Sequence, residues 1–269
     1  MNYKNKNLSF LENQLENKLE DLINNEYLLA IKAEFEAEGT RIDELALLSE
    51  LCCKKNVALT LKIGGPYAQR DFYEAFQLGA SNILVPMIES KYTLQKSFEI
   101  YSNFLSIFKN LGSSPDFSFN IESKLGINNI ESIISYVSEN NLPIKEIVIG
   151  RSDLARSLGI IDVNSNLIFE ISKSILIKKK NLEINVGGNL SGKSFEFINQ
   201  LTSYGLKSFE SRKCTFKCSE DLIEEKFNKI IRKGLEFELS WLNYKKKMYS
   251  ERSEEENNRI IKIKERLLD

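Results

Sequence analysis

The sequence contains no histidine among its 269 residues. This absence excludes Ser-His and Cys-His catalytic arrangements, histidine metal ligands and an imidazole general base. Any catalysis must therefore use carboxylates, lysine, tyrosine, cysteine or a metal ion held by oxygen ligands.

Cysteine and long apolar runs are also scarce. The four cysteines fit reduced thiols better than a disulfide framework in a chain of this length. The C-x3-C spacing of Cys214 and Cys218 does not predict a zinc site, because only an adjacent cysteine pair and no histidine could complete it. No apolar run approaches the ~20 residues of a membrane span, and the N-terminus lacks the apolar core of a signal peptide. We therefore expect a cytoplasmic protein with no membrane partner.

An excess of charge of either sign is missing as well. Lysine and arginine together number 37, and aspartate and glutamate number 38. This balance provides no overall basic field, so we expect no nucleic-acid partner and assign any anion binding to local sites. What the chain does have is 42% hydrophobic and 10% aromatic residues, which is enough to bury a full core.

Short apolar runs alternate with helical periodicities along the chain, as in a parallel sheet buried on both faces. Seven strands are expected near residues 28, 58, 83, 117, 146, 184 and 206. An eighth is expected either in the N-terminal segment or in residues 157–163. Repeated β-α units over roughly 250 residues favour an α/β fold of the (β/α)8 TIM barrel type over an open doubly wound sheet.

Three regions are expected from this pattern. They are an N-terminal helix over residues 1–25, the barrel over residues 26–217 and a long C-terminal helical arm over residues 218–269. The arm is expected to pack on the barrel or on a partner subunit, and a solvated terminal helix is the alternative for its last twenty residues or so.

The stretch GGNLSGKS at residues 187–194 matches the phosphate-binding pattern G-x-x-x-x-G-K-S. A P-loop domain normally continues with several more strands, whereas only one strand and a helical tail are expected here, so the nucleotide interpretation is disfavoured. In a barrel, the loops after the seventh and eighth strands often bind anions through backbone amides, and this stretch is expected there. We expect Gly187, Gly188 and Asn189 to bind an anion, with a turn that only caps the next helix as the alternative.

Active sites of barrels lie at the C-terminal ends of the strands. The polar residues expected there are Glu34, Glu36, Glu38, Lys62, Glu89, Asn120, Glu122, Arg151, Asp153, Asn189, Glu210 and Arg212. Glu122 and Asp153 would provide carboxylate ligands for a divalent ion with further water or substrate ligands. Lys62 and Arg212 would offset the charge of a substrate carboxylate or phosphate. For any single residue, a salt bridge at the rim is the alternative.

Three segments, QLGASNILVPMIES, FSFNIESKLGINNIESI and VIGRSDLARSLG, resemble in order and spacing those of the HpcH/HpaI aldolase and citrate lyase β-subunit family. The resemblance spans roughly residues 28–212. It implies a (β/α)8 barrel that binds Mg²⁺ or a similar ion such as Mn²⁺. It also implies carbon–carbon bond chemistry through the enolate of a pyruvate-like or acetyl-type substrate.

The resemblance also implies roles for individual residues. Glu122 and Asp153 match the two metal-ligating carboxylates of the family. Asn120 stands where a glutamine often lies. The backbone of Gly150, Arg151 and Ser152 matches the turn whose amides contact the substrate carboxylate.

Two departures from the family concern the substrate and the base. Lys62 stands where the aldolases carry an arginine, which removes bidentate carboxylate recognition. The aldolases also use a histidine as base near the first βα loop, where this chain has Thr40 and Arg41. Glu36 or Glu38, or a metal-bound water, would then act as base. LKIGG, PMIES and FESRK together resemble a less characterised branch, in which the reaction is free to differ.

We therefore expect a lyase that depends on Mg²⁺ or Mn²⁺ and acts on a small carboxylated molecule, such as a 2-keto acid with or without a phosphate group. Lys62 as a Schiff-base former is a variant of this hypothesis. The alternatives are a non-catalytic barrel that serves as a ligand sensor or scaffold, and other phosphoenolpyruvate or pyruvate chemistry. Because family members commonly exchange C-terminal helices, we expect a homo-oligomer formed through those helices.

Overall fold

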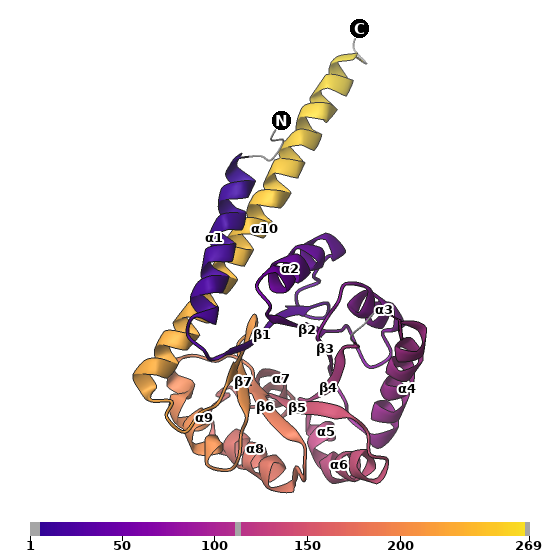
Figure 1. Ribbon diagram of the computed structural model, residues 1–269, viewed down its shortest axis with the longest axis vertical. Helices are drawn as coiled ribbons and strands as arrows, with labels where there is room; N and C mark the ends of the chain where they lie inside the picture. The colour runs from indigo at the N-terminus through magenta and orange to yellow at the C-terminus, as the bar shows by residue number, and fades with distance from the viewer. Residues whose placement is uncertain (1–5, 111–113, 267–269) are drawn as a thin grey trace.

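Eight short strands form a closed barrel whose order follows the chain (Figure 1). The computed structural model describes residues 6–110 and 114–266. The strands are β1 (Leu28–Glu34), β2 (Ala58–Lys62), β3 (Asn82–Val85), β4 (Asp116–Ile121), β5 (Ile144–Gly150), β6 (Glu183–Gly187), β7 (Ser208–Glu210) and β8 (Cys214–Lys217). The predicted fold class, an α/β barrel of the TIM type, is confirmed.

Helices surround this barrel on the outside (Figure 1). They are α1 (Lys6–Ile23), α2 (Ile42–Lys54), α3 (Gln69–Gln77), α4 (Lys91–Ile107), α5 (Lys124–Asn128), α6 (Ile130–Glu139), α7 (Arg151–Ser157), α8 (Asn166–Lys178), the 3-10 helix η1 (Gly192–Ser194), α9 (Phe195–Thr202) and α10 (Glu224–Arg266). The first and last helices, α1 and α10, pack against each other and extend together away from the barrel.

The eighth strand differs from the sequence prediction in place and direction. Residues 157–163 end α7 and continue as a loop, and the eighth strand is instead β8. It is antiparallel to both neighbours, β7 and β1. Only three residues separate β7 from β8, and a parallel connection would need a crossover of a dozen or more residues. The loop at residues 187–194 therefore follows the sixth strand, not the seventh.

The two faces of the strands differ in polarity. Outward-facing side chains such as Ile31, Phe119 and Ile149 are fully buried against the helices and form the hydrophobic core. The barrel interior carries polar residues in place of the bulky aliphatic layers common in barrels. Buried polar side chains on the strands include Lys32, Thr60, Lys62, Asn82, Ser118, Asn120, Asn185, Ser208, Glu210 and Thr215. Such groups remain buried only when hydrogen bonds, ion pairs or water satisfy them.

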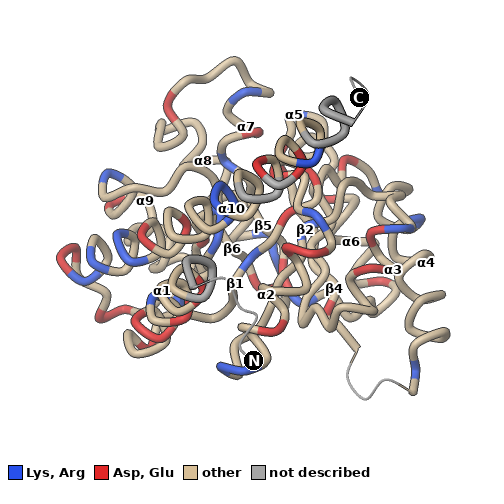
Figure 2. Tube along the Cα trace, turned by 90° about the horizontal axis from the view of Figure 1, so that it is seen from above, with Lys and Arg blue, Asp and Glu red and all other residues tan. Residues whose placement is uncertain are grey.

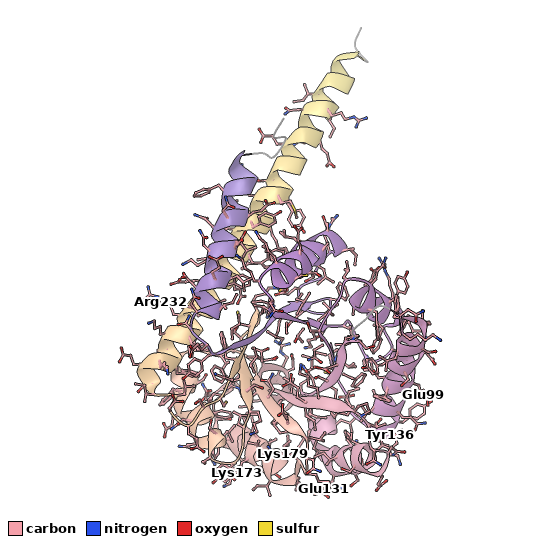
Figure 3. The ribbon with its side chains drawn as sticks, in the orientation of Figure 1. Glu99, Glu131, Tyr136, Lys173, Lys179 and Arg232 are labelled. Atoms are coloured by element: carbon pink, nitrogen blue, oxygen red, sulfur yellow. The ribbon has the colours of Figure 1, made fainter. Side chains whose placement is uncertain are left out.

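The outer surface carries acidic and basic residues in mixture over the helices (Figure 2). Glu99, Glu131, Lys173 and Arg232 lie on the outside of the helices (Figure 3). None of the helices in the described part of the chain is both long and apolar enough to cross a membrane. Assembly through the C-terminal helices stays a prediction.

Candidate active site

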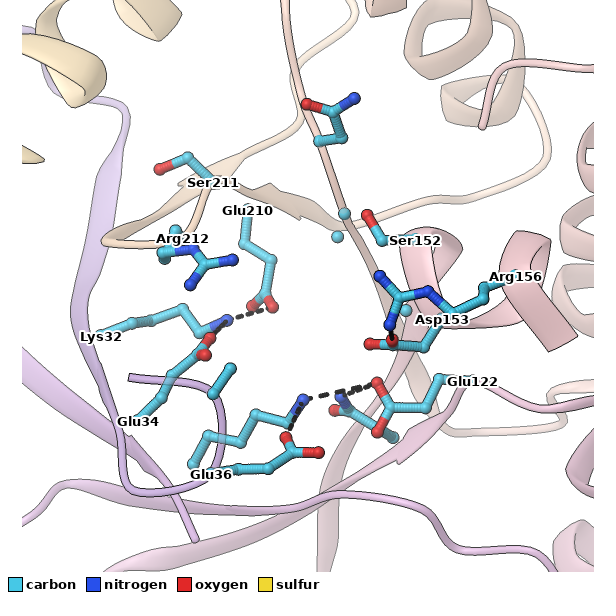
Figure 4. Close-up of a pocket in the computed structure, with 17 residues that line it drawn as sticks. Lys32, Glu34, Glu36, Glu122, Ser152, Asp153, Arg156, Glu210, Ser211 and Arg212 are labelled. Atoms are coloured by element: carbon cyan, nitrogen blue, oxygen red, sulfur yellow. Dashed lines mark hydrogen bonds and ion pairs between the residues drawn. The ribbon is translucent and has the colours of Figure 1, made fainter. Parts of the chain in front are cut away.

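A cavity of about 260 Å³ opens at the C-terminal ends of the parallel strands (Figure 4). Polar and charged side chains from β1, β2, β4 and β7 converge in it, together with the loops after β5 and β6. The lining residues are Lys32, Glu34, Glu36, Ala37, Lys62, Asn120, Glu122, Gly150, Ser152, Asp153, Arg156, Gly187, Gly188, Asn189, Glu210, Ser211 and Arg212. Most of the residues predicted from strand ends therefore share one cavity.

Glu122 follows β4 and lies buried at the cavity wall. One carboxylate oxygen accepts a hydrogen bond from the backbone N–H of Met87 at 3.0 Å. The other accepts one from the side-chain amide of Asn120 at 2.8 Å and lies 3.5 Å from the ammonium of Lys62. Burial raises the pKa of Glu122 above its ordinary value, although Lys62 and Asn120 oppose the increase. A bound cation would favour the charged form further.

Met87 owes its contact with Glu122 to an uncommon backbone conformation. Its φ is 54°, in the left-handed region that side-chain-bearing residues rarely adopt. This turn directs the Met87 N–H at the carboxylate, so the PMIES segment contributes to the site through its backbone.

Asp153 and Asn120 supply further oxygen atoms beside Glu122. Asp153 lies in the first turn of α7, half-exposed, with one oxygen 3.3 Å from the guanidinium of Arg156. The side-chain carbonyl oxygen of Asn120 is buried and has no hydrogen-bond partner among the described residues. Two carboxylates and an unsatisfied carbonyl oxygen suit a hard divalent cation such as Mg²⁺. Within residues 6–110 and 114–266, no group of three or more His, Cys, Asp or Glu side chains is placed to hold a metal.

Lys62 bridges two carboxylates. Its ammonium lies 2.7 Å from Glu36 and 3.5 Å from Glu122. Burial by itself lowers the pKa of Lys62, but the negative charges of Glu122 and Glu36 outweigh it and hold the pKa above its ordinary value. Lys62 is therefore a fixed positive charge at neutral pH.

A second ion-pair group lies beside the first. The ammonium of Lys32 forms a hydrogen-bonded ion pair with Glu210 and lies 3.8 Å from Glu34. The other oxygen of Glu210 accepts a hydrogen bond from Asn185 at 2.9 Å. Arg212 lies close to this group in the cavity (Figure 4). The cavity wall thus carries cationic side chains that lie beside carboxylates.

Arg151 and Glu38 lie outside the cavity lining. The guanidinium of Arg151 is buried and donates to the carbonyl oxygens of Gly187 at 3.0 Å and Gly188 at 2.7 Å. Only the Arg151 backbone could therefore contact a substrate. Glu38 forms an ion pair with the buried ammonium of Lys213, which places this predicted base away from the cavity.

The loop at residues 187–194 is fixed against α7. Gly188 has a φ of 91°, and a Cβ atom there would lie 2.6 Å from the backbone nitrogen of Ser152. Ser191 and Ser194 cap η1, and Lys193 is exposed and absent from the cavity lining. A P-loop lysine would instead face the phosphates. The anion-binding role of residues 187–189 stays a prediction.

Three polar lining residues, Lys32, Arg156 and Ser211, were missed by reasoning from strand ends. Lys32 could have been found from the alternation in β1, because Lys32, Glu34 and Glu36 recur at every second position. Arg156 lies a helical turn beyond Asp153, and Ser211 lies in the unrecognised β7–β8 turn, so neither carried a local signal.

Replacing Gly150 with alanine should displace Glu122 and weaken any ligand binding that depends on its carboxylate. The new Cβ atom would lie 2.5 Å from one carboxylate oxygen of Glu122 and 2.8 Å from its Cβ. We expect Gly150→Ala to cost about 1 to 3 kcal/mol in the free energy of unfolding, measured with urea. Gly65→Ala is the matched control, because its Cβ would have no neighbour within 4 Å. Equal stability of the two variants would contradict this packing.

A family model for HpcH/HpaI aldolase/citrate lyase matches residues 43–191. No protein with a curated description matches the chain. Among solved structures, an HpcH/HpaI aldolase from Desulfitobacterium hafniense DCB-2 is similar with a TM-score of 0.55 and 12% identity, over 67% of this chain and 75% of that one. Citrate synthase SbnG aligns with a TM-score of 0.58 and 15% identity, over 72% and 81%. A family protein from Burkholderia cenocepacia J2315 aligns with 0.56 and 12%, over 83% and 84%. At these identities the structural likeness establishes the fold.

Proposed function

Because the chain belongs to the HpcH/HpaI aldolase/citrate lyase family, we propose that it is a divalent-metal-dependent carbon–carbon lyase acting on a small 2-keto acid or a related carboxylated molecule. The observation that carries the proposal is the convergence of Glu122, Asp153 and the unpaired oxygen of Asn120 in one cavity that also holds Lys62. Glu122 and Asp153 would hold Mg²⁺ or Mn²⁺. When bound, the ion would offset the negative charge that develops on a substrate carbonyl oxygen.

The cations of the cavity would bind and orient the substrate. Lys62 and Arg212 place positive charge at the cavity wall, where a substrate carboxylate or phosphate would offset it. Ser152 also lines this cavity, and its backbone N–H would donate to a substrate carboxylate. Since Lys62 cannot bind a carboxylate in the bidentate manner of arginine, this site tolerates more than one substrate orientation.

Glu36 is the member of the predicted pair of bases that remains available in the cavity. One of its carboxylate oxygens accepts from Lys62, and the second oxygen would take a proton from a substrate carbon. The raised pKa of Lys62 argues against the Schiff-base variant, because imine formation needs the neutral amine.

Calorimetric titration would test this function. Mg²⁺ and Mn²⁺ are each titrated with and without oxalate, pyruvate or phosphoenolpyruvate, on the wild type, Asp153→Asn and the control Asp116→Asn. Asp116 is an exposed carboxylate at the opposite end of the barrel. We expect oxalate or pyruvate to bind only with metal, and this binding to weaken at least tenfold in Asp153→Asn but not in the control.

The outcomes separate the proposed function from its alternatives. If neither metal nor keto acid binds, the proposed lyase function is wrong for this chain. Metal-dependent binding without cleavage of any 2-keto acid would favour the ligand-binding barrel. Preferential binding of phosphoenolpyruvate would favour the alternative phosphoenolpyruvate chemistry.

A further inference from the structure

A second cavity, of about 250 Å³, lies at the opposite, N-terminal end of the barrel. It is lined by residues from the beginnings of the strands, among them Thr60, Asn82, Glu146, Ser208 and Thr215. The lyase function proposed above uses none of these side chains. The lower cavity and the active-site cavity therefore face each other through the polar barrel interior.

A column of polar groups joins the two cavities. Glu210 lines the active-site cavity and accepts a hydrogen bond from Asn185 at 2.9 Å. Glu146 lines the lower cavity and lies close enough to Asn185 and Glu210 for both to affect its pKa. Ser208 contributes a further contact to Glu146, at 3.4 Å. Asn185 is fully buried, so this column runs through the centre of the barrel.

Two atoms along this interior have no protein partner. Among the described residues, the buried Asn82 side-chain nitrogen and the side-chain oxygen of Asn185 make no hydrogen bond. Both side chains are at least 99% buried, since their exposed fractions are 1% and 0%. Buried polar atoms left without protein partners are usually satisfied by ordered water. The interior between the cavities is therefore suited to hold a chain of water molecules.

Glu146 is a titratable group at the lower end of this column. Burial raises the pKa of Glu146 to about 7, and the negative charge of Glu210 on β7 adds to the increase. The positive charges of Lys145 on β5 and Lys32 on β1 and the hydrogen bond from Asn185 on β6 oppose it. Glu183 and Lys207 are the other charged groups of the lower cavity. Glu146 thus exchanges its proton near neutral pH, where a histidine would otherwise serve.

We propose that the barrel interior is a hydrated passage through which Glu146 exchanges protons between the Lys32–Glu210 pair of the active site and solvent in the lower cavity. In each transfer, the Lys32–Glu210 pair first takes up one proton from the active-site cavity. One proton then leaves the pair, passes along the waters and is taken up by the Glu146 carboxylate. Glu146 finally releases one proton to solvent, so the pair and Glu146 both return to their starting protonation states. That a reaction uses this passage rests on the proposed lyase function. The existence of the passage does not depend on that function.

The first test needs no substrate. The protein is labelled with ¹³C at the glutamate carboxyl carbons and titrated by NMR, and the resonance absent in Glu146→Gln is assigned to Glu146. We expect this resonance to titrate near neutral pH in the wild type and at lower pH in Glu210→Gln. Titration at the ordinary glutamate pH, or no response to Glu210→Gln, would overturn the proposal.

A crystal structure tests the hydration directly. Ordered waters bound to Asn82 and Asn185 and connecting the two cavities would support the passage. A dry interior would exclude it, whatever the activity of the protein.

The second test uses pyruvate as the probe. With Mg²⁺ in deuterated water, deuterium incorporation into the methyl group of pyruvate is followed by NMR from pH 5 to 9. We expect the wild-type rate to rise with pH through about 7, and Glu146→Gln to lose this rise and exchange roughly tenfold more slowly at pH 8. Glu131→Gln, which neutralises a carboxylate on the outside of α6 away from both cavities, is the matched control and should keep the wild-type profile.

The two tests fail separately. An unchanged profile in Glu146→Gln would reject the proton-exchange role. If the wild type exchanges no pyruvate protons, enolate chemistry on pyruvate fails, while the carboxyl titration and the waters still decide whether the passage exists.

Discussion

Glu122→Gln should abolish metal-dependent binding of oxalate and lower kcat/KM for 2-keto acid cleavage by roughly a thousandfold, equivalent to about 4 kcal/mol of transition-state stabilisation. Glutamine has nearly the same shape but carries no charge. One end of its amide must also present N–H groups to existing donors, either the Met87 N–H or the Asn120 amide and Lys62 ammonium. The variant therefore loses a proposed cation ligand and gains a donor-to-donor contact. Calorimetry with Mg²⁺ and oxalate measures the first effect, and steady-state kinetics measures the second.

Two further variants define this result. Glu131→Gln is the matched control, because Glu131 lies on the outside of α6 in a surface ion pair with Lys178. This variant should bind metal and oxalate as the wild type does. Glu122→Asp keeps the charge on a shorter side chain and should retain part of the binding. Full oxalate binding by Glu122→Gln would remove Glu122 from the metal site.

Arg151→Ala should lower the free energy of unfolding by about 3 to 5 kcal/mol. The Arg151 side chain is fully buried, donates to the carbonyl oxygens of Gly187 and Gly188 and to the side chain of Asn164, and lies 4.7 Å from the centre of the Phe197 ring. Burial lowers the pKa of Arg151 to about 10, so the guanidinium stays charged at neutral pH. Its removal leaves a cavity and unpaired buried oxygens.

Urea unfolding followed by circular dichroism measures this loss. Arg156→Ala is the control, because it removes the same side chain from an exposed position on the same helix and should change stability by at most about 0.5 kcal/mol. Arg151→Lys should not restore stability, since lysine cannot direct several donors to these oxygens at once. A shift no larger than that of the control would show that the guanidinium does not hold the loop.

Local sequence patterns were sufficient to predict the fold class, because they indicate which segments are buried. Runs such as residues 57–63 and 146–150 are short and apolar, lie between helices, and became parallel strands of the barrel. The same patterns located the cavity, since polar residues such as Lys62, Asn120 and Asp153 lie at or just beyond the C-terminal ends of such runs, and the strand ends of a barrel meet at one face. The absence of histidine limited the possible chemistry independently of the fold.

The sequence did not predict which side chains pair with one another. Arg151 donates to the Gly187 and Gly188 carbonyls, Lys32 pairs with Glu210, and Glu38 pairs with Lys213. No local pattern around Arg151, Lys32 or Glu38 indicates these partners. The first pair joins residues 36 positions apart on the neighbouring units of β5 and β6. The other two join residues 178 and 175 positions apart, so they form only when the barrel closes.

The sequence by itself determined seven of the eight strands and most of the helices, which residues follow those strands, and which chemistry the chain lacks, because each depends on residue type and on periodicity over a few positions. The tertiary structure alone decided that the eighth strand returns antiparallel from a three-residue turn, that Arg151 faces away from the cavity, and that Glu210, Asn185 and Glu146 align along the barrel interior. The last two features depend on contacts between segments that are separate in the chain, whose geometry no local preference of the chain fixes.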